Sequence, residues 1–136
     1  METLSKLSAR ALEYYITSRR WKSDLYFSNL EITFLNRLLD EHFHELVDAG
    51  IKARLKELGK RLSDVVSEEQ QIKELLEQQI EKLEQLAKDG SDEHTEELAG
   101  KQAHLEYLMM DWIHEYRVIK EELFLVLGGY LDTRRL

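Results

Sequence analysis

The chain has 136 residues, a length that suits one domain with a hydrophobic core of its own. It carries 27 acidic and 19 basic residues, and the net charge of −8 argues against nucleic acids and anionic membranes as partners. It contains no proline and no cysteine, which removes the strongest helix breaker and excludes disulfides, thiolate nucleophiles and cysteine-ligated metals.

The first part of the chain carries apolar residues at alternating spacings of three and four, which we call the seam. Its positions are Leu4, Leu7, Ala11, Tyr14, Ser18, Trp21, Leu25, Ser28, Ile32, Leu35, Leu39, His42 and Leu46. This spacing keeps one stripe of a helix turned toward a partner and predicts a helix over residues 3–48. Gly50 suits the left-handed conformation that ends such a helix. The polar run at 17–20 leaves open that the first 17 residues form a separate segment.

The middle of the chain repeats the seam. Its positions are Ile51, Leu55, Leu58, Leu62, Val65, Glu69, Ile72, Leu76, Gln79, Leu83 and Leu86. They predict a second helix over residues 51–89, with Gly90 as its terminator. Ser67 and Gln70 fit a capping box, so a break between Asp64 and Ser67 is the alternative. The seam passes that point without a change of phase, which favours one continuous helix.

A third seam predicts a helix over residues 92–132, capped by Ser91 or Asp92. Its positions are Leu98, Gln102, Leu105, Met109, Trp112, Tyr116, Ile119, Leu123, Val126 and Tyr130. Three helices of matched length with short connections predict an all-α, coiled-coil-like antiparallel up-down-up bundle that forms one domain over residues 1–136.

Charge placement gives an independent argument for antiparallel pairing. The second helix is basic early, around Arg54 and Arg61, and acidic late, around Glu77. Folding the first helix back places acidic residues 40–48 beside the basic half and Lys22 beside the acidic half. The basic cluster therefore has partners within the chain and needs no nucleic acid.

The same fold brings the seam amides of Gln79 and Gln102 to one level. Paired amides in an apolar seam would fix the register of the second and third helices. The alternative is that both side chains lie near helix ends and are partly hydrated.

The first and third helices carry apolar residues outside the seam, whereas the second is polar on its back. The residues of this second stripe are Phe27, Leu30, Phe34 and Leu38 on the first helix and Tyr107, Met110 and Val118 on the third. Soluble monomers rarely leave such a surface in water, so we expect it to bind a partner. A homodimer is the simplest solution, and another helical protein or the chain's own N-terminal segment are the alternatives.

A metal site is the rival interpretation. Counting register through both turns places Glu31 level with His114, and Asp111 lies three residues before His114 on the same helical face. In a twofold dimer, two copies of Glu31, Asp111 and His114 would resemble in number the ligands of a di-metal centre in a four-helix layer. A plain salt bridge between Glu31 and His114 is the simpler use of these residues.

Motifs that carry catalysis are missing from the sequence. It has no glycine-rich phosphate loop and no nucleophile–base motif, and it predicts no cofactor. The first residues lack the apolar core of a signal peptide, and we expect a cytoplasmic location. The sequence thus predicts a non-enzymatic protein–protein interaction or scaffolding module, with a ferritin-like metal-binding or redox protein as the alternative.

Overall fold

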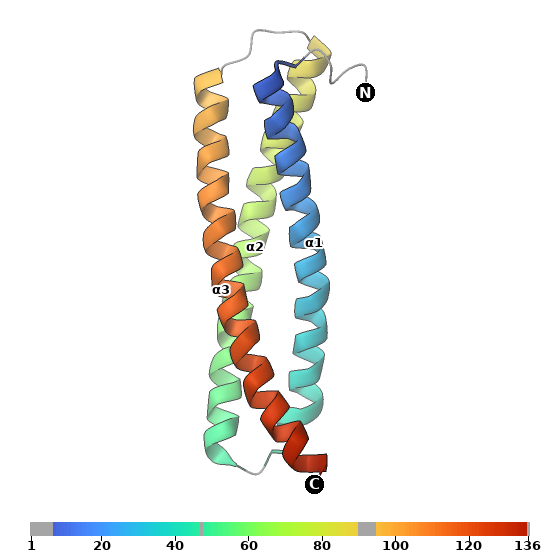
Figure 1. Cartoon of the computed structure of the whole chain (residues 1–136), viewed down its shortest axis with the longest axis vertical. Helices are drawn as coiled ribbons and strands as arrows, with labels where there is room; N and C mark the ends of the chain where they lie inside the picture. The colour runs from blue at the N-terminus through green and yellow to red at the C-terminus, as the bar shows by residue number, and fades with distance from the viewer. Residues whose placement is uncertain (1–6, 47, 90–94, 136) are drawn as a thin grey trace. The chain divides into compact units, whose positions relative to one another are not determined.

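A computed structural model describes residues 7–46, 48–89 and 95–135 of the chain. It contains three helices, α1 (Ala9–Phe43), α2 (Ala49–Asp89) and α3 (Thr95–Arg135), which Figure 1 shows as long ribbons. No strand occurs among these residues. The prediction of an all-α fold with three long helices is confirmed.

The turn between α1 and α2 differs from the prediction. α1 ends at Phe43 rather than near residue 48, and Gly50 lies in the first turn of α2 instead of ending α1. Asp48 is the N-cap of α2: its Oδ1 accepts the Ile51 N–H at 3.0 Å, and its carbonyl accepts the Lys52 N–H at 3.1 Å. A short polar run can end one helix or start the next, and here the Asp48 side chain favours the start.

Helix α2 is continuous from Ala49 to Asp89, so the predicted continuity is confirmed and the break near Ser67 is wrong. Val65, which precedes the proposed capping box, and Glu69, which lies within it, are both buried. α3 begins at Thr95 and extends to Arg135, three residues beyond the predicted end. The predicted caps at residues 90–92 and the start of the first helix at residues 3–6 lie outside the described residues.

The chain divides into two compact units, and each contains segments of all three helices. Unit 1 combines Met1–Phe27 with Glu69–Met110, and unit 2 combines Ser28–Glu68 with Asp111–Leu136. Within each unit the helix segments pack as in a helical bundle. A single domain over residues 1–136 stays a prediction.

The core of unit 1 includes a cluster at one end of its helix segments. Leu7, Ala11, Leu83, Ala87 and Leu98 are buried against one another. The half-buried side chains of Leu12, Tyr14, Tyr15 and Leu86 pack around this cluster. Residues 7–17 are therefore part of the core of unit 1 and not a separate segment.

The core of unit 2 centres on the indole of Trp112, which is 1% exposed. Its Nε1–H donates to the carbonyl oxygen of Val65 at 2.9 Å, and its ring stacks on Tyr116 with centroids 5.4 Å apart. Seam residues of the three segments fill the rest of this core: Ile32, Leu35, Leu39, Leu55, Leu58, Leu62, Ile119 and Leu123. The predicted seam is thus the buried stripe of each helix.

Near the ends of α2 and α3 the buried stripe drifts by one residue from the predicted seam. Ala87 is fully buried while Leu86 is half-buried, and Leu127 is buried while Val126 is half-buried. A straight helix has 3.6 residues per turn, so a strict spacing of 3.5 falls behind over several turns. The prediction used the strict spacing and therefore missed Ala87 and Leu127.

The Asp48 cap gives a test of the start of α2. Asp48→Ala removes the acceptor for the Ile51 N–H and should lower the free energy of unfolding by about 1 kcal/mol, measured by urea denaturation. Asp40→Ala on exposed α1 surface is the matched control and should change it by less than about 0.5 kcal/mol. Equal effects of the two substitutions would show that Asp48 does not act as a cap.

Candidate functional site

In unit 1, large apolar side chains of α1 and α3 are exposed. Phe27 is 63% exposed, and its ring meets that of Tyr26 edge to face with centroids 5.6 Å apart. On α3, Tyr107 and Met110 are 68% and 66% exposed. Three residues predicted from the second stripe thus lie on the surface of this unit. Tyr26 was missed because it directly follows the seam residue Leu25 and belongs to neither stripe.

In unit 2, Leu30 and Phe34 of α1 are each more than half exposed. Leu38 of α1 and Val118 of α3 are half-buried, so they contribute less apolar surface than the sequence predicts. Phe124 and Leu125 of α3 are also exposed. Phe124 was missed because it follows the seam residue Leu123, and its size was the only signal in the sequence.

Glu31 is the centre of a polar cluster within unit 2. Its carboxylate accepts a hydrogen bond from the Tyr116 hydroxyl, and Lys120 Nζ lies 3.0 Å from its Oε1. The Lys120 ammonium also lies 5.5 Å from the centroid of the Tyr116 ring. The Tyr116 hydrogen bond, together with Lys120, lowers the pKa of Glu31 below its usual value. The cluster therefore holds Glu31 in its charged form.

The expected salt bridge between Glu31 and His114 is wrong. Glu31 bonds to Tyr116 and Lys120, which lie farther along α3 than the predicted register allowed, while His114 and Asp111 are exposed. Tyr116 belongs to the buried stripe of α3, but its side chain is long enough for the hydroxyl to reach the half-buried Glu31 carboxylate. Within the described residues, no group of three or more His, Asp or Glu side chains is placed to hold a metal ion.

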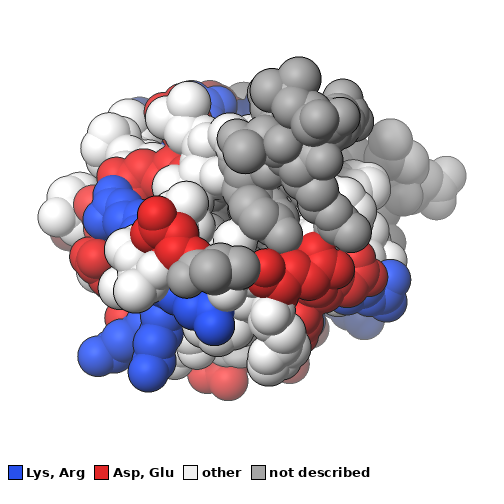
Figure 2. Space-filling model, turned by 90° about the horizontal axis from the view of Figure 1, so that it is seen from below, with Lys and Arg blue, Asp and Glu red and all other residues white. Residues whose placement is uncertain are grey.

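The basic half of α2 pairs with α3 in unit 2. Arg54 Nη2 lies 2.7 Å from Glu122 Oε2, and Arg61 bonds to both Glu122 and Glu115. The sequence placed these arginines beside the acidic end of the first helix, so their partners were predicted wrongly. Figure 2 shows acidic and basic side chains interspersed on the face that it draws.

The acidic half of α2 behaves as predicted within unit 1. Lys22 Nζ of α1 lies 3.6 Å from Glu77 Oε1 of α2. Both side chains are about half exposed, so this pair contributes a few tenths of a kcal/mol at most. Its value is in showing which residues of α1 and α2 are neighbours.

Two amides and a hydroxyl form a buried polar layer in unit 1. Gln79 Nε2 donates to Gln102 Oε1 at 3.3 Å, and the Ser18 hydroxyl donates to the same oxygen at 3.3 Å. Gln79 is 2% exposed and Gln102 is 7% exposed. The prediction that these amides meet is confirmed, and the alternative of partly hydrated ends is wrong.

The fold and these side chains define an all-helical protein with exposed apolar residues on α1 and α3. Comparison with models of protein families, with curated proteins and with solved structures found no match. Within the described part of the chain, no helix is long and apolar enough to cross a membrane.

The Tyr116–Glu31 bond predicts a dependence of stability on alkaline pH. Burial raises the pKa of Tyr116 above its usual value of 10.0, and the hydrogen bond to Glu31 adds to the shift. The unfolded chain therefore loses this proton at lower pH than the folded chain, and stability falls as pH rises above about 10. Tyr116→Phe should lower the free energy of unfolding by about 1 kcal/mol at neutral pH and make this alkaline decline smaller. Part of the decline should remain, because burial and the hydrogen bond to Glu84 also raise the pKa of Tyr15.

Urea denaturation at neutral pH and at about pH 10.5 measures both effects. Tyr107→Phe, which changes an exposed tyrosine in the same way, is the matched control and should keep the decline. An unchanged alkaline decline in Tyr116→Phe would contradict the assignment.

Proposed function

We propose that this chain is a non-enzymatic, cytoplasmic protein–protein interaction module that binds a second copy of itself. The exposed apolar residues of α1 and α3 carry the proposal. Phe27, Tyr107 and Met110 in unit 1, and Leu30 and Phe34 in unit 2, are each more than half exposed. Leu38 and Val118, both half-buried, complete the predicted stripe at its edge.

The size of these side chains supports a role in binding. Fully burying a Phe, Leu or Met side chain contributes roughly 1.5–3 kcal/mol, so several together can offset the entropic cost of association. Isolated exposed apolar residues are common, but contiguous apolar patches above a few hundred Å² are rare on monomers. The concentration of large residues on two of the three helices is what favours an interface.

A second copy is the partner that fits this composition best. A twofold interface pairs one surface with itself, so an apolar surface meets an apolar surface without any need for complementary charge. The net charge of −8 on each copy would oppose association through charged surfaces. Apolar burial is therefore the main favourable term available to such a dimer.

We further propose that the three helices run antiparallel, up-down-up. In unit 1, Tyr15 bonds to Glu84 and Lys22 pairs with Glu77, so the α2 partner comes earlier as α1 advances. In unit 2, Arg54 pairs with Glu122 and Arg61 with Glu115, and the same reversal holds between α2 and α3. Both sets of contacts support the antiparallel arrangement.

Charge substitutions in the stripe test the homodimer. Phe34→Glu with Leu38→Glu would force two carboxylates into the apolar interface, and the dimer dissociation constant should rise at least about a hundredfold. Light scattering in the tens of micromolar range measures the mass, and circular dichroism should show that the chain stays largely helical. Because Phe34 is exposed on unit 2 and does not belong to the core, its replacement should leave the helices intact.

The matched control places the same charges, at the same spacing, on α2. Ser63 and Ser67 are exposed in unit 2, and Ser63→Glu with Ser67→Glu should leave the mass and the helix content unchanged. A monomeric mass for the unmodified chain would contradict the homodimer, and so would an unchanged dimer in the Phe34–Leu38 variant.

Cross-linking tests the antiparallel arrangement, because the chain has no cysteine of its own. A chain with Lys22→Cys and Glu77→Cys should be joined internally by a short bis-maleimide in high yield. A chain with Lys22→Cys and Asp89→Cys should not, because Asp89 lies twelve residues, or about 18 Å, farther along α2. Mass spectrometry of the cross-linked peptides distinguishes the two results, and the reverse order of yields would contradict the arrangement.

A further inference from the structure

Three large apolar side chains lie on the face of α1 that is turned away from the core. Phe27, Leu30 and Phe34 follow one another at spacings of three and four residues, so they share one side of the helix. Each is more than half exposed, whereas Leu25 and Ile32 on the same helix are buried. All of these residues belong to one continuous helix. The outward face of α1 therefore has an apolar centre.

Exposed charged residues lie on both sides of this apolar centre. Arg20 and Asp24 precede it, and Arg37 and Glu41 follow it, each on the outward face or at its border. In the part of the chain that the structure describes, none of the four side chains makes an ion pair. Two positive and two negative charges thus surround the apolar centre and are available to a partner.

The outward face of α1 is complementary to its own reverse. A twofold axis that makes two copies of a helix antiparallel brings together residues at equal distances on either side of one point along the helix. On α1 this point lies midway between residues 30 and 31. The pairs at equal distance from it are Phe27 with Phe34, Asp24 with Arg37, and Arg20 with Glu41. An apolar residue therefore corresponds to an apolar one, and each basic residue to an acidic one.

Other alignments of two α1 helices place like charges together. In a parallel pair each residue lies level with its own copy, so arginine would face arginine. An antiparallel pair shifted by four residues in one direction would place Arg20 level with Arg37, and a shift in the other direction would place Asp24 level with Glu41. Like charges at close range are unfavourable, and complementary charges set register more than affinity. The charges therefore favour the antiparallel alignment centred between residues 30 and 31.

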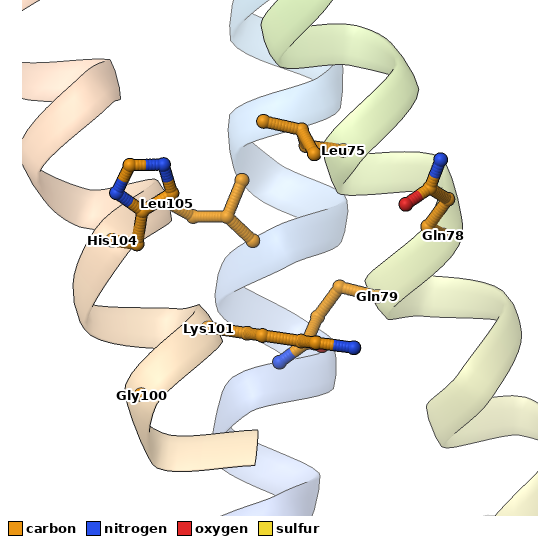
Figure 3. Close-up of a pocket in the computed structure, with 7 residues that line it drawn as sticks. All are labelled: Leu75, Gln78, Gln79, Gly100, Lys101, His104 and Leu105. Atoms are coloured by element: carbon orange, nitrogen blue, oxygen red, sulfur yellow. The ribbon is translucent and has the colours of Figure 1, made fainter. Parts of the chain in front are cut away.

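The hollow between α2 and α3 in unit 1 offers no comparable surface. Figure 3 shows Gln78, Lys101 and His104 around it, beside two leucines. Lys101 also pairs with Glu97 at 3.3 Å. This lining is largely polar, so the hollow lacks the apolar centre that the outward face of α1 has.

We propose that α1 pairs antiparallel with α1 of a second copy, about a twofold axis between residues 30 and 31. Leu30 then meets its own copy at the axis, and Phe27 meets Phe34 of the second copy. The flanking arginines lie level with acidic residues of the second copy. This inference rests on the proposed homodimer and specifies the centre, direction and register of its interface. A dimer can exist with a different pairing, so mass and pairing are measured separately.

Charge reversal tests the alignment. Arg20→Glu places a carboxylate level with Glu41 of the second copy at both ends of the pair, so the dimer dissociation constant should rise about tenfold at low ionic strength. Glu41→Arg alone should weaken the dimer by a similar factor. Both substitutions in one chain restore opposite charges, and the dissociation constant should return to within about threefold of the original. Light scattering over a dilution series measures the constant.

Lys56→Glu is the matched control, because it changes the net charge by the same amount at an exposed position of α2. It should change the dissociation constant by less than about twofold. The alignment is wrong if the single reversals on α1 have no larger effect than Lys56→Glu, or if the double reversal is weaker than either single one.

Single cysteines test the direction of the pair, because the chain has no cysteine of its own. Leu30→Cys lies at the axis, so a short bis-maleimide should join it to the same residue of the second copy in high yield. Ser23→Cys is exposed on the same face but would lie level with residue 38 of the second copy, about 22 Å along the helix from its own copy. It should therefore stay unlinked, and denaturing electrophoresis measures both yields.

Each result of the cross-linking decides between specific arrangements. Equal linking of the two cysteines would indicate a parallel pair and overturn this inference while leaving the homodimer. A dimeric mass without linking at residue 30 would overturn it as well. A monomeric mass for the unmodified chain would overturn the homodimer and this pairing with it.

Discussion

The structure depends on the requirement that each long helix bury a single apolar stripe. An isolated helix of ordinary composition is only marginally stable in water, because its own hydrogen bonds contribute too little free energy. Packing of its apolar face against other helices supplies most of its stability. In this chain the alternating spacing of three and four supplies that stripe on α1, α2 and α3, and its residues fill the cores of both units. The polar contacts described above lie at its edges or interrupt it at defined positions.

The interruptions give the packing its specificity. Apolar side chains of similar size allow helices to slide past one another by a turn, whereas a hydrogen bond between buried groups holds at one register only. In unit 1 that role falls to Gln79, Gln102 and Ser18. In unit 2 the Trp112 indole fixes α3 against the carbonyl of Val65. Each unit thus has its own register-setting bond between helices.

The sequence correctly predicted the features that depend only on the periodicity of apolar residues. Continuity of α2 through Ser67 and the meeting of Gln79 with Gln102 followed from the phase of the seam, and both are observed.

The predictions that were wrong depended on the positions of single atoms, which periodicity does not determine. Asp48 was assigned to the wrong helix because a carboxylate can cap a helix start or simply follow an end. The partner of Glu31 was missed because a register shift of two residues, combined with the reach of a tyrosine, exchanges one neighbour for another. The orientation of the Gln79 amide could not be predicted, since it depends on which amide atom lies against the Leu98 carbonyl.

The division into two units has an optical consequence. The chain contains two tryptophans, and they fall one in each unit: Trp21, half-buried, in unit 1 and Trp112, fully buried, in unit 2. Replacing either with phenylalanine leaves a fluorophore that reports on one unit alone. Coincident fluorescence transitions from the two single-tryptophan chains would show that the units melt as one cooperative body, and separate transitions would give each unit its own unfolding free energy.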